Sequence, residues 1–176
     1  MAIREILTYP NPLLRHEAKT VTRFDEELAE LIHDMAATMY AAPGVGLAAN
    51  QIGVLKQVVV MDIAPRDQPN ELIVLINPEI MTREGEVVDE EGCLSVREYT
   101  AKVKRAQKIM VKAQDIKGNF REFEAEEWLA RVIQHEVDHL RGILYIDYLS
   151  SLKRILYKKR LKKILFEEME ANEAEV

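Results

Sequence analysis

Apolar residues recur at helical spacing in three stretches of the chain. In the first, about residues 25–41, they follow one helical face as Leu28, Leu31, Ile32, Met35 and Met39. A second stretch, about residues 126–140, places on one helical face Trp128, Val132, His135, Glu136 and His139. A third opens near Ser150 and mixes apolar residues with many charges. The spacing predicts three helices, of which the first covers a sheet and the second ends at Gly142.

Shorter stretches rich in β-branched residues predict strands. Two of them, residues 57–63 and 72–77, are separated by a polar turn. Residues 99–105, 108–115 and 120–125 predict an antiparallel meander, and its last two strands join across residues 117–119. The expected fold class is therefore α+β, with antiparallel sheets packed around the helix of residues 126–140, an N-terminal helix and a C-terminal helix.

Composition and charge narrow the class of protein. The 176 residues suit one catalytic domain over residues 1–176, and 48% hydrophobic with 31% charged residues is typical of a folded chain. A net charge of -6 argues against general or specific DNA binding. With no secretory h-region and no apolar run of membrane-span length, we expect a soluble, cytoplasmic protein without membrane contact. The lone Cys93 fits a reducing compartment.

The segment HEVDH places two imidazoles one helical turn apart. His135 and His139 can therefore bind one ion from the same side, and Glu136 between them can reach a water on that ion. A surface helix with two solvated histidines would give the same string. A catalytic metal site normally takes three protein ligands and leaves a fourth position to water, so a third ligand is required.

Cys93 is the best available third ligand. It lies in EEGCLS between predicted strands, where Gly92 allows a turn that aims a thiolate into a cleft. An unpaired cysteine is also commonly a small buried core residue. The chemistry indicated by Cys93, His135, His139 and Glu136 together is metal-dependent hydrolysis.

A glycine-containing loop, GVGLAANQIG, covers residues 44–53. Gln51 in this loop offers an amide N–H that would serve as an oxyanion donor, and the glycines let a backbone approach a substrate closely. The segment lacks the lysine and hydroxyl residue of a phosphate-binding loop. Taken alone, such a loop between a helix and a strand is also explained by structure.

Three segments together resemble the motifs of the peptide deformylase family. They are GVGLAANQ at residues 44–51, EGCLS at residues 91–95 and QHEVDHLRG at residues 134–142, in the family's order. The early YPNPLLRHEAKTV at residues 9–21 is also similar to the family's opening segment, so the resemblance covers nearly the whole chain. One departure is Arg97, where many members have proline or glycine, and it affects the expected shape of the substrate groove.

The resemblance implies a metal centre and a reaction. Cys93, His135 and His139 would bind Fe2+, exchangeable for Zn2+ or Ni2+, with Glu136 as general acid and base. The implied reaction removes the formyl group from the N-terminal formylmethionine of nascent polypeptides and releases formate. The family's mechanism places the oxyanion between Gln51 and the backbone N–H of Leu94.

Substrate contacts are expected beside this centre. The resemblance implies that Gly46 contacts the substrate backbone. An apolar pocket for methionine is expected to include Val45, Trp128 and Val132, although the last two would equally suit the core.

The helix of residues 150–170 is strongly basic in an acidic chain. Its cations are Lys153, Arg154, Lys158, Lys159, Arg160, Lys162 and Lys163. A solvated face explains such a run, but a cationic helix on an enzyme of nascent chains would also dock on the ribosome.

Two other readings use the same residues. In a zinc protease of the HExxHxxG type the third histidine would fall at Tyr145, so that ligand is missing. The other type of HExxH protease needs an acidic ligand beyond the helix, for which Glu167 and Glu168 are candidates on a helix that is expected to lie on the surface. A closed structural zinc site would need a fourth ligand, and His16 and His33 are the only other histidines.

Overall fold

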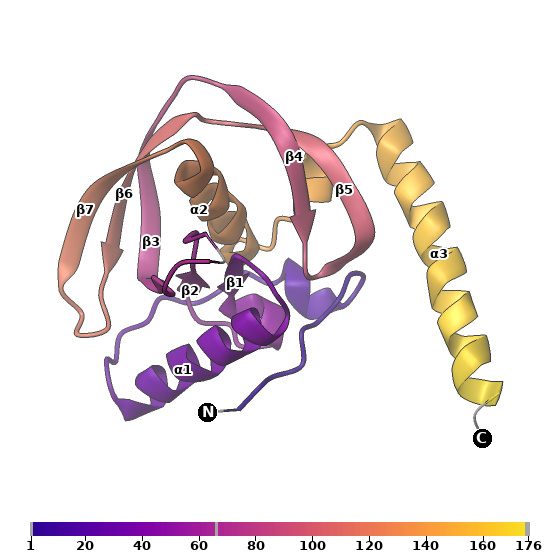
Figure 1. Ribbon diagram of the computed structural model, residues 1–176, viewed down its shortest axis with the longest axis horizontal. Helices are drawn as coiled ribbons and strands as arrows, with labels where there is room; N and C mark the ends of the chain where they lie inside the picture. Colours follow the sequence, from indigo (N-terminus) through magenta and orange to yellow (C-terminus); the bar gives the residue numbers. More distant parts are fainter. Residues whose placement is uncertain (1, 66, 175–176) are drawn as a thin grey trace.

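The computed structural model describes residues 2–65 and 67–174, which form two antiparallel sheets and three α-helices (Figure 1). Five strands form one sheet in the order β1-β2-β3-β6-β7. These strands are β1 (Gly46–Ala48), β2 (Val58–Met61), β3 (Ile73–Glu84), β6 (Lys108–Gln114) and β7 (Phe120–Glu126). The second sheet pairs β4 (Val87–Cys93) with β5 (Val96–Arg105). The α+β prediction is confirmed.

The second sheet continues the first as a bent ribbon. Strands β3 and β4 follow each other across a turn at Gly85 (φ 65°), while β5 and β6 are joined by only two residues. At the bend, the Gln134 side chain accepts a hydrogen bond from the Ala106 N–H at 3.0 Å and donates one to the Ala106 carbonyl at 2.9 Å. These two bonds pair backbone groups at a point where the ladder is interrupted. The ribbon can therefore turn away from the five-stranded sheet and pass over helix α2.

Helix α2 (Glu127–Leu140) lies in the middle of the molecule, between the five-stranded sheet and the ribbon (Figure 1). On the sheet side its buried residues Ala130, Ile133 and Val137 pack in one core cluster with Val59 and Val111. Its opposite side carries the histidines toward the ribbon. The central helix predicted for residues 126–140 is confirmed, and Gly142 follows it with a φ of 72°.

Helix α1 (Glu26–Ala41) covers the other face of the sheet. It begins after Asp25, whose side chain accepts a hydrogen bond from the Leu28 N–H at 3.2 Å. The predicted apolar stripe is buried against β1 and β2, together with Leu47, Val58 and Val60. The N-terminal helix predicted for residues 25–41 is therefore confirmed within one residue.

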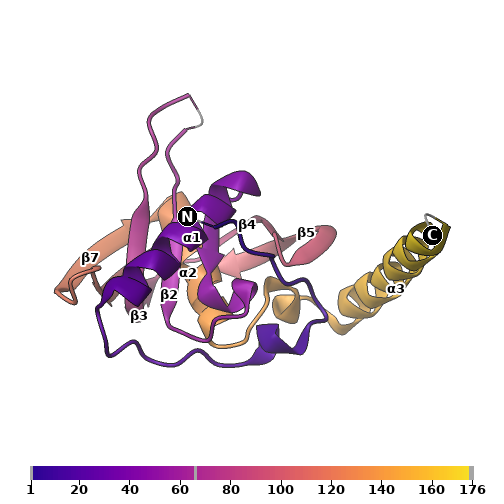
Figure 2. The ribbon, with the colours of Figure 1, turned by 90° about the horizontal axis from the view of Figure 1, so that it is seen from below.

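Helix α3 (Ser151–Ala174) extends away from the body of the molecule (Figure 2). Tyr157 and Leu161 anchor it in a cluster with β5 and the 3-10 turn η3 (Tyr145–Tyr148). Its outer side exposes Leu152, Ile155, Leu156, Phe166 and Met169. Among the described residues, no helix is both long and apolar enough to cross a membrane.

The predicted meander is wrong in one strand. β6 and β7 pair as expected, but residues 99–105 belong to β5, which pairs with β4 and not with β6. The sequence did not predict β4, because VVDEEGC carries three consecutive acidic residues that face mostly outward. β3 also continues seven residues beyond the predicted end at Asn77, across irregular pairing with β6.

Candidate metal centre

Three potential metal ligands converge from two elements. Cys93 ends β4, while His135 and His139 lie one turn apart on α2, and the nearest ligand atoms of the three all lie within 4.8 Å of one another. The Cys93 Sγ lies 3.2 Å from the His139 Nε2. The structure therefore brings together the sulfur and the two imidazoles singled out in the sequence. A thiolate with two imidazoles suits Fe2+ or Zn2+ far better than Mg2+ or Ca2+.

The turn after Cys93 joins this site to the glycine loop. The turn consists of Leu94 and Ser95, and Gly92 remains in the strand. Gln51, on the 3-10 turn η2 (Ala49–Ile52), donates to the Ser95 Oγ at 3.0 Å, and its Nε2 lies 3.6 Å from the Cys93 Sγ. The side-chain amide oxygen of Gln51, Oε1, accepts a hydrogen bond from the Ala48 N–H at 2.9 Å. This bond fixes the amide with its N–H2 group toward the sulfur.

A buried carboxylate orients His135. Glu91 accepts a hydrogen bond from His135 Nδ1 at 2.9 Å, which leaves Nε2 for an ion. Glu91 also accepts from Arg105 at 2.8 and 3.0 Å and from Arg131 at 2.7 Å. Burial alone would raise its pKa, but hydrogen bonds from His135 and Arg105 lower the pKa of Glu91 to about 2. The carboxylate is therefore charged throughout the physiological range.

The two imidazoles differ in their electrostatic surroundings. Burial lowers the pKa of His139 well below its ordinary value, which keeps this ring in the neutral form that binds metals. Burial also lowers the pKa of His135, but hydrogen bonds with Cys93 and Glu91 outweigh it and raise that pKa well above the ordinary value. Glu91 thus holds a proton on His135 Nδ1. The Nδ1 of His139 is buried and has no hydrogen-bond partner among the described residues.

Glu136 faces the cleft with one carboxylate oxygen unpaired. Its side chain is buried, and its Oε2 has no hydrogen-bond partner in the described part of the chain. Burial raises the pKa of Glu136 to about 7, the range in which a carboxylate both accepts and releases protons. A Cβ on Gly46 would lie 2.5 Å from the Glu136 Oε1, so only glycine allows this approach.

A cleft of about 490 Å³ opens onto these residues. Of the predicted substrate contacts, Val45, Gly46 and Trp128 line it, together with Leu94, His135 and Glu136. Val45 and Trp128 are about half exposed, as expected of a cavity rim. Val132 is buried in the core cluster beside the sheet and is not among the lining residues. Its place in a methionine pocket remains a prediction.

The residues required by the other readings lie elsewhere or are engaged. Tyr145 stacks on His135 with ring centroids 6.0 Å apart, and its hydroxyl donates to the Tyr99 carbonyl at 2.6 Å. Glu168 pairs with Arg97 on the surface, and His16 and His33 are exposed. The ligand cluster among the described residues contains none of these side chains.

The residues that support the histidines were missed by the sequence analysis. Glu91 stands inside the EGCLS motif, but nothing in the sequence indicated that it contacts His135. Arg105 and Arg131 come from β5 and α2, and their ion pairs with Glu91 depend on the unpredicted strand β4. Knowledge of the β4–β5 pairing would have placed Glu91 beside α2.

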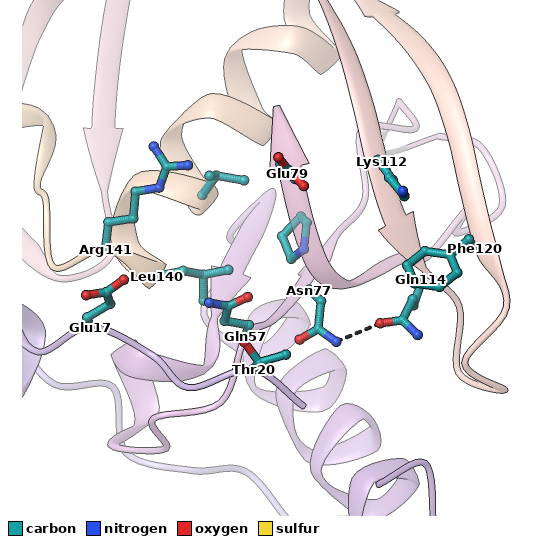
Figure 3. Close-up of a pocket in the computed structure, with 12 residues that line it drawn as sticks. Glu17, Thr20, Gln57, Asn77, Glu79, Lys112, Gln114, Phe120, Leu140 and Arg141 are labelled. Atoms are coloured by element: carbon teal, nitrogen blue, oxygen red, sulfur yellow. Dashed lines mark hydrogen bonds between the residues drawn. The ribbon is translucent and has the colours of Figure 1, made fainter. Parts of the chain in front are cut away.

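A second cavity, of about 500 Å³, lies on the other side of α2 (Figure 3). Val137 and Leu140 of α2 line it, and so does Arg141, which follows the helix. Its amides are used internally: Asn77 donates to Gln114 at 2.7 Å and exchanges two hydrogen bonds with the Val21 backbone. These bonds hold the N-terminal arm on the sheet, which gives the polar walls a structural explanation.

Comparisons of the sequence and of the structure with known proteins all identify the same family. The family model described as polypeptide deformylase matches residues 3–155. The peptide deformylase of Desulfotalea psychrophila is 56% identical over 155 residues, covering 88% of this chain and 92% of that protein. The one from Acidobacterium capsulatum is 51% identical over 154 residues, covering 88% and 91%. The crystal structure of a peptide deformylase from Legionella pneumophila superposes with a TM-score of 0.88 at 48% identity, covering 97% and 98% of the two chains.

Proposed function

This chain belongs to the polypeptide deformylase family of hydrolases, and on that premise we propose that it removes the N-formyl group from formylmethionine at the start of nascent polypeptides. The observation that carries the proposal is the convergence of Cys93, His135 and His139 next to Glu136, at a cleft that Cys93, His135 and Glu136 line. Residues 1–176 would act as one catalytic domain, working in the cytoplasm where nascent chains emerge.

The proposed cofactor is a divalent ion held by Cys93, His135 and His139. The donor set, the carboxylate behind His135 and the unpaired Glu136 oxygen all fit such an ion. By ligand type Fe2+ and Zn2+ both fit, and the family resemblance favours Fe2+, with Zn2+ or Ni2+ as substitutes. Bound there, the ion would supply Lewis-acid chemistry that makes water nucleophilic near neutral pH.

Proton transfer, stabilisation of the oxyanion and binding of the substrate are carried out by groups of the protein itself. Glu136 accepts a proton from the attacking water and later delivers it to the leaving amine. The Gln51 amide and the Leu94 N–H face the charge that develops on the formyl oxygen. Gly46 lines the cleft and would contact the substrate backbone, and Val45 and Trp128 would offer apolar surface to the methionine side chain.

The proposal is tested by release of formate from a formylmethionyl peptide. We expect activity that a chelator abolishes, decay in air for the iron form and air stability after Ni2+ or Zn2+ replacement, because an iron thiolate is open to oxidation. Cys93→Ala, prepared without oxygen, should lose most of its metal and turnover. His33→Ala is the matched control, since this histidine is exposed on α1. A Cys93→Ala protein with full metal and full turnover would refute the metal assignment.

We also propose that α3 docks this enzyme on the ribosome. All but one of its seven cations between Lys153 and Lys163 are exposed, on a helix that extends away from the body (Figure 2). The exposed cations of such a helix can contact the phosphates of ribosomal RNA while the cleft in the body of the protein keeps its structure. Truncation after Leu149 should abolish co-sedimentation with ribosomes, and added salt should weaken it.

A triple replacement separates charge from folding in that experiment. Changing Lys158, Lys159 and Lys162 to glutamate keeps the buried Tyr157 and Leu161, which anchor α3. If the triple variant sediments with ribosomes like the parent, docking through these charges is wrong, whatever the truncated protein does.

A further inference from the structure

The proposed ligands come from two elements that must be held in register. Cys93 is on the ribbon and both histidines are on α2, 42 residues or more along the chain. We propose that Arg131 is the positioning residue that clamps the ribbon to α2 and so sets the sulfur against the imidazoles. This inference rests on the proposed metal site. It gives a role to a side chain that contacts neither ligand sulfur nor imidazole.

The Arg131 guanidinium reaches three points on the ribbon. One of its terminal nitrogens, Nη1, donates to Glu91 at 2.7 Å and to the Val103 carbonyl at 3.0 Å. The other, Nη2, donates to the Val87 carbonyl at 3.0 Å. Val87 and Glu91 belong to β4 and Val103 to β5, so a single α2 side chain ties down both strands. A planar fork of donors is suited to such a task, and a lysine ammonium is not.

The charge of Arg131 is balanced inside the protein. Arg131, Arg105 and Glu91 are all about 4% exposed, and Arg105 also pairs with Asp138 at 2.5 Å. Two cations thus face two carboxylates. Because desolvation offsets much of the attraction in a buried pair, such a network is weak support for stability and better explained by the geometry that it imposes. In our proposal, the network fixes the course of the backbone between Glu91 and Cys93.

The clamp acts where the ribbon changes register. Pairing of β4 with β5 is regular from Val87 to Glu91 and shifts between Glu91 and Cys93. An irregular ladder does not fix the next residue by itself. Because Arg131 holds Glu91 immediately before this irregularity, it determines where the Cys93 Sγ lies relative to His139. The same carboxylate orients His135, so both halves of the ligand set depend on one contact.

The experiment measures Co2+ binding to the full chain, by competition with a chelator and by the thiolate-to-cobalt absorption band. Arg131→Met and Arg131→Lys are compared with the parent. We expect both variants to bind Co2+ about 10- to 100-fold more weakly, the usual effect of removing an outer-shell partner. At saturating Co2+ their absorption band should also differ from the parent band. Arg121→Met on β7 is the control, since that arginine is 73% exposed and should change neither readout.

The outcomes separate this inference from the function on which it rests. If the parent shows no thiolate-to-cobalt band, the proposed metal site fails. If the parent shows the band and both Arg131 variants match its affinity and spectrum, the clamp is refuted. Full rescue by Arg131→Lys would also refute it, because charge without the fork would then suffice. Should Arg131→Met fail to fold, the Lys variant alone decides, with metal-free thermal melting as the measure of folding.

Discussion

Helix α2 is flanked by two cavities of nearly equal size, and they differ in how their polar groups are satisfied. The cleft has a volume of about 490 Å³, and the second cavity has about 500 Å³. Figure 3 shows this second cavity, here called the rear cavity, with Asn77, Glu79 and Gln114 among its lining residues. On the cleft side, Glu136 lines the cavity and His139 lies one turn along α2 from His135, and each keeps a buried polar atom without a partner in the described chain. In the rear cavity, Asn77 and Gln114 bond to each other and to the backbone. Unsatisfied polar atoms, and not volume, therefore distinguish the side of the helix that we propose to be catalytic.

The largest expected difference is between the effects on turnover of replacing a carboxylate at each cavity. Glu136→Ala should reduce turnover by roughly 100-fold or more with metal content unchanged, because a positioned general base is lost. Glu79→Ala, which changes an exposed carboxylate lining the rear cavity, should leave turnover within about twofold of the parent, as for surface sites. Formate release with metal analysis measures both. Near-normal turnover of a metal-replete Glu136→Ala would remove the distinction.

Gly46→Ala tests how narrowly Glu136 is placed. The new methyl group would lie 2.5 Å from the Glu136 Oε1, so the carboxylate must move, and a displacement of that kind costs on the order of 10- to 100-fold in turnover. Gly53→Ala is the control. It strains a backbone with a φ of 76°, but its Cβ meets no atom closer than 3.7 Å. The Gly53 variant should lose stability and keep its turnover per folded molecule.

Glu136→Gln should stabilise the metal-free protein while inactivating it. The pKa of Glu136 is about 7 in the folded state and 4.5 as its ordinary value, so ionising the buried group opposes folding. The gain from glutamine should be complete above pH 7, decline as the pH falls from 7 to 4.5, and vanish below. It should be on the order of 3 kcal/mol, because each unit of difference in pKa corresponds to about 1.4 kcal/mol. Denaturant unfolding at pH 8 and pH 4 gives the measurement, and an equal gain at both values would contradict the raised pKa.

Gln114→Ala should have the smallest effect, and only on stability. It removes the acceptor of Asn77 and the 2.9 Å bond to the Gly118 carbonyl, at a cost of about 1 kcal/mol. Turnover and metal content should not change, since these bonds support the N-terminal arm through Asn77 and the turn between β6 and β7. A loss of turnover at full folding would show that the rear cavity takes part in the reaction after all.

The sequence was most informative about features that depend on neighbouring residues alone. The apolar stripe of α1 and the helical spacing of His135 and His139 follow from local periodicity, and the lone Cys93 follows from composition. The structure brings Cys93 together with both histidines. The family resemblance was likewise confirmed by the matched family model. These features are local, so a single sequence carries them.

Features that depend on pairing between distant strands were not predictable in this way. β4 lacks the alternation of a half-buried strand, because it faces α2 at Glu91 and solvent at Asp89 and Glu90. Without β4, neither the support of His135 nor the clamp at Arg131 could be inferred. Val132 illustrates the converse difficulty: its helical position suited both the pocket and the core.

The bend at Gly85 and Ala106 divides the ribbon into parts that should exchange their amide hydrogens at different rates. Before the bend, β3 and β6 lie inside a five-stranded sheet, so their amides should open only with global unfolding. Beyond it, β4 and β5 are a pair of strands, and two strands alone are marginal in water. Protection of their amides from exchange must therefore come from packing against α2 and from the core cluster that joins β5 to η3 and α3. A local opening of β4 and β5 would move Cys93 away from α2 and would increase deuterium uptake in residues 87–105. Uptake in these residues therefore measures, without any substrate, how firmly the proposed metal ligands are held together.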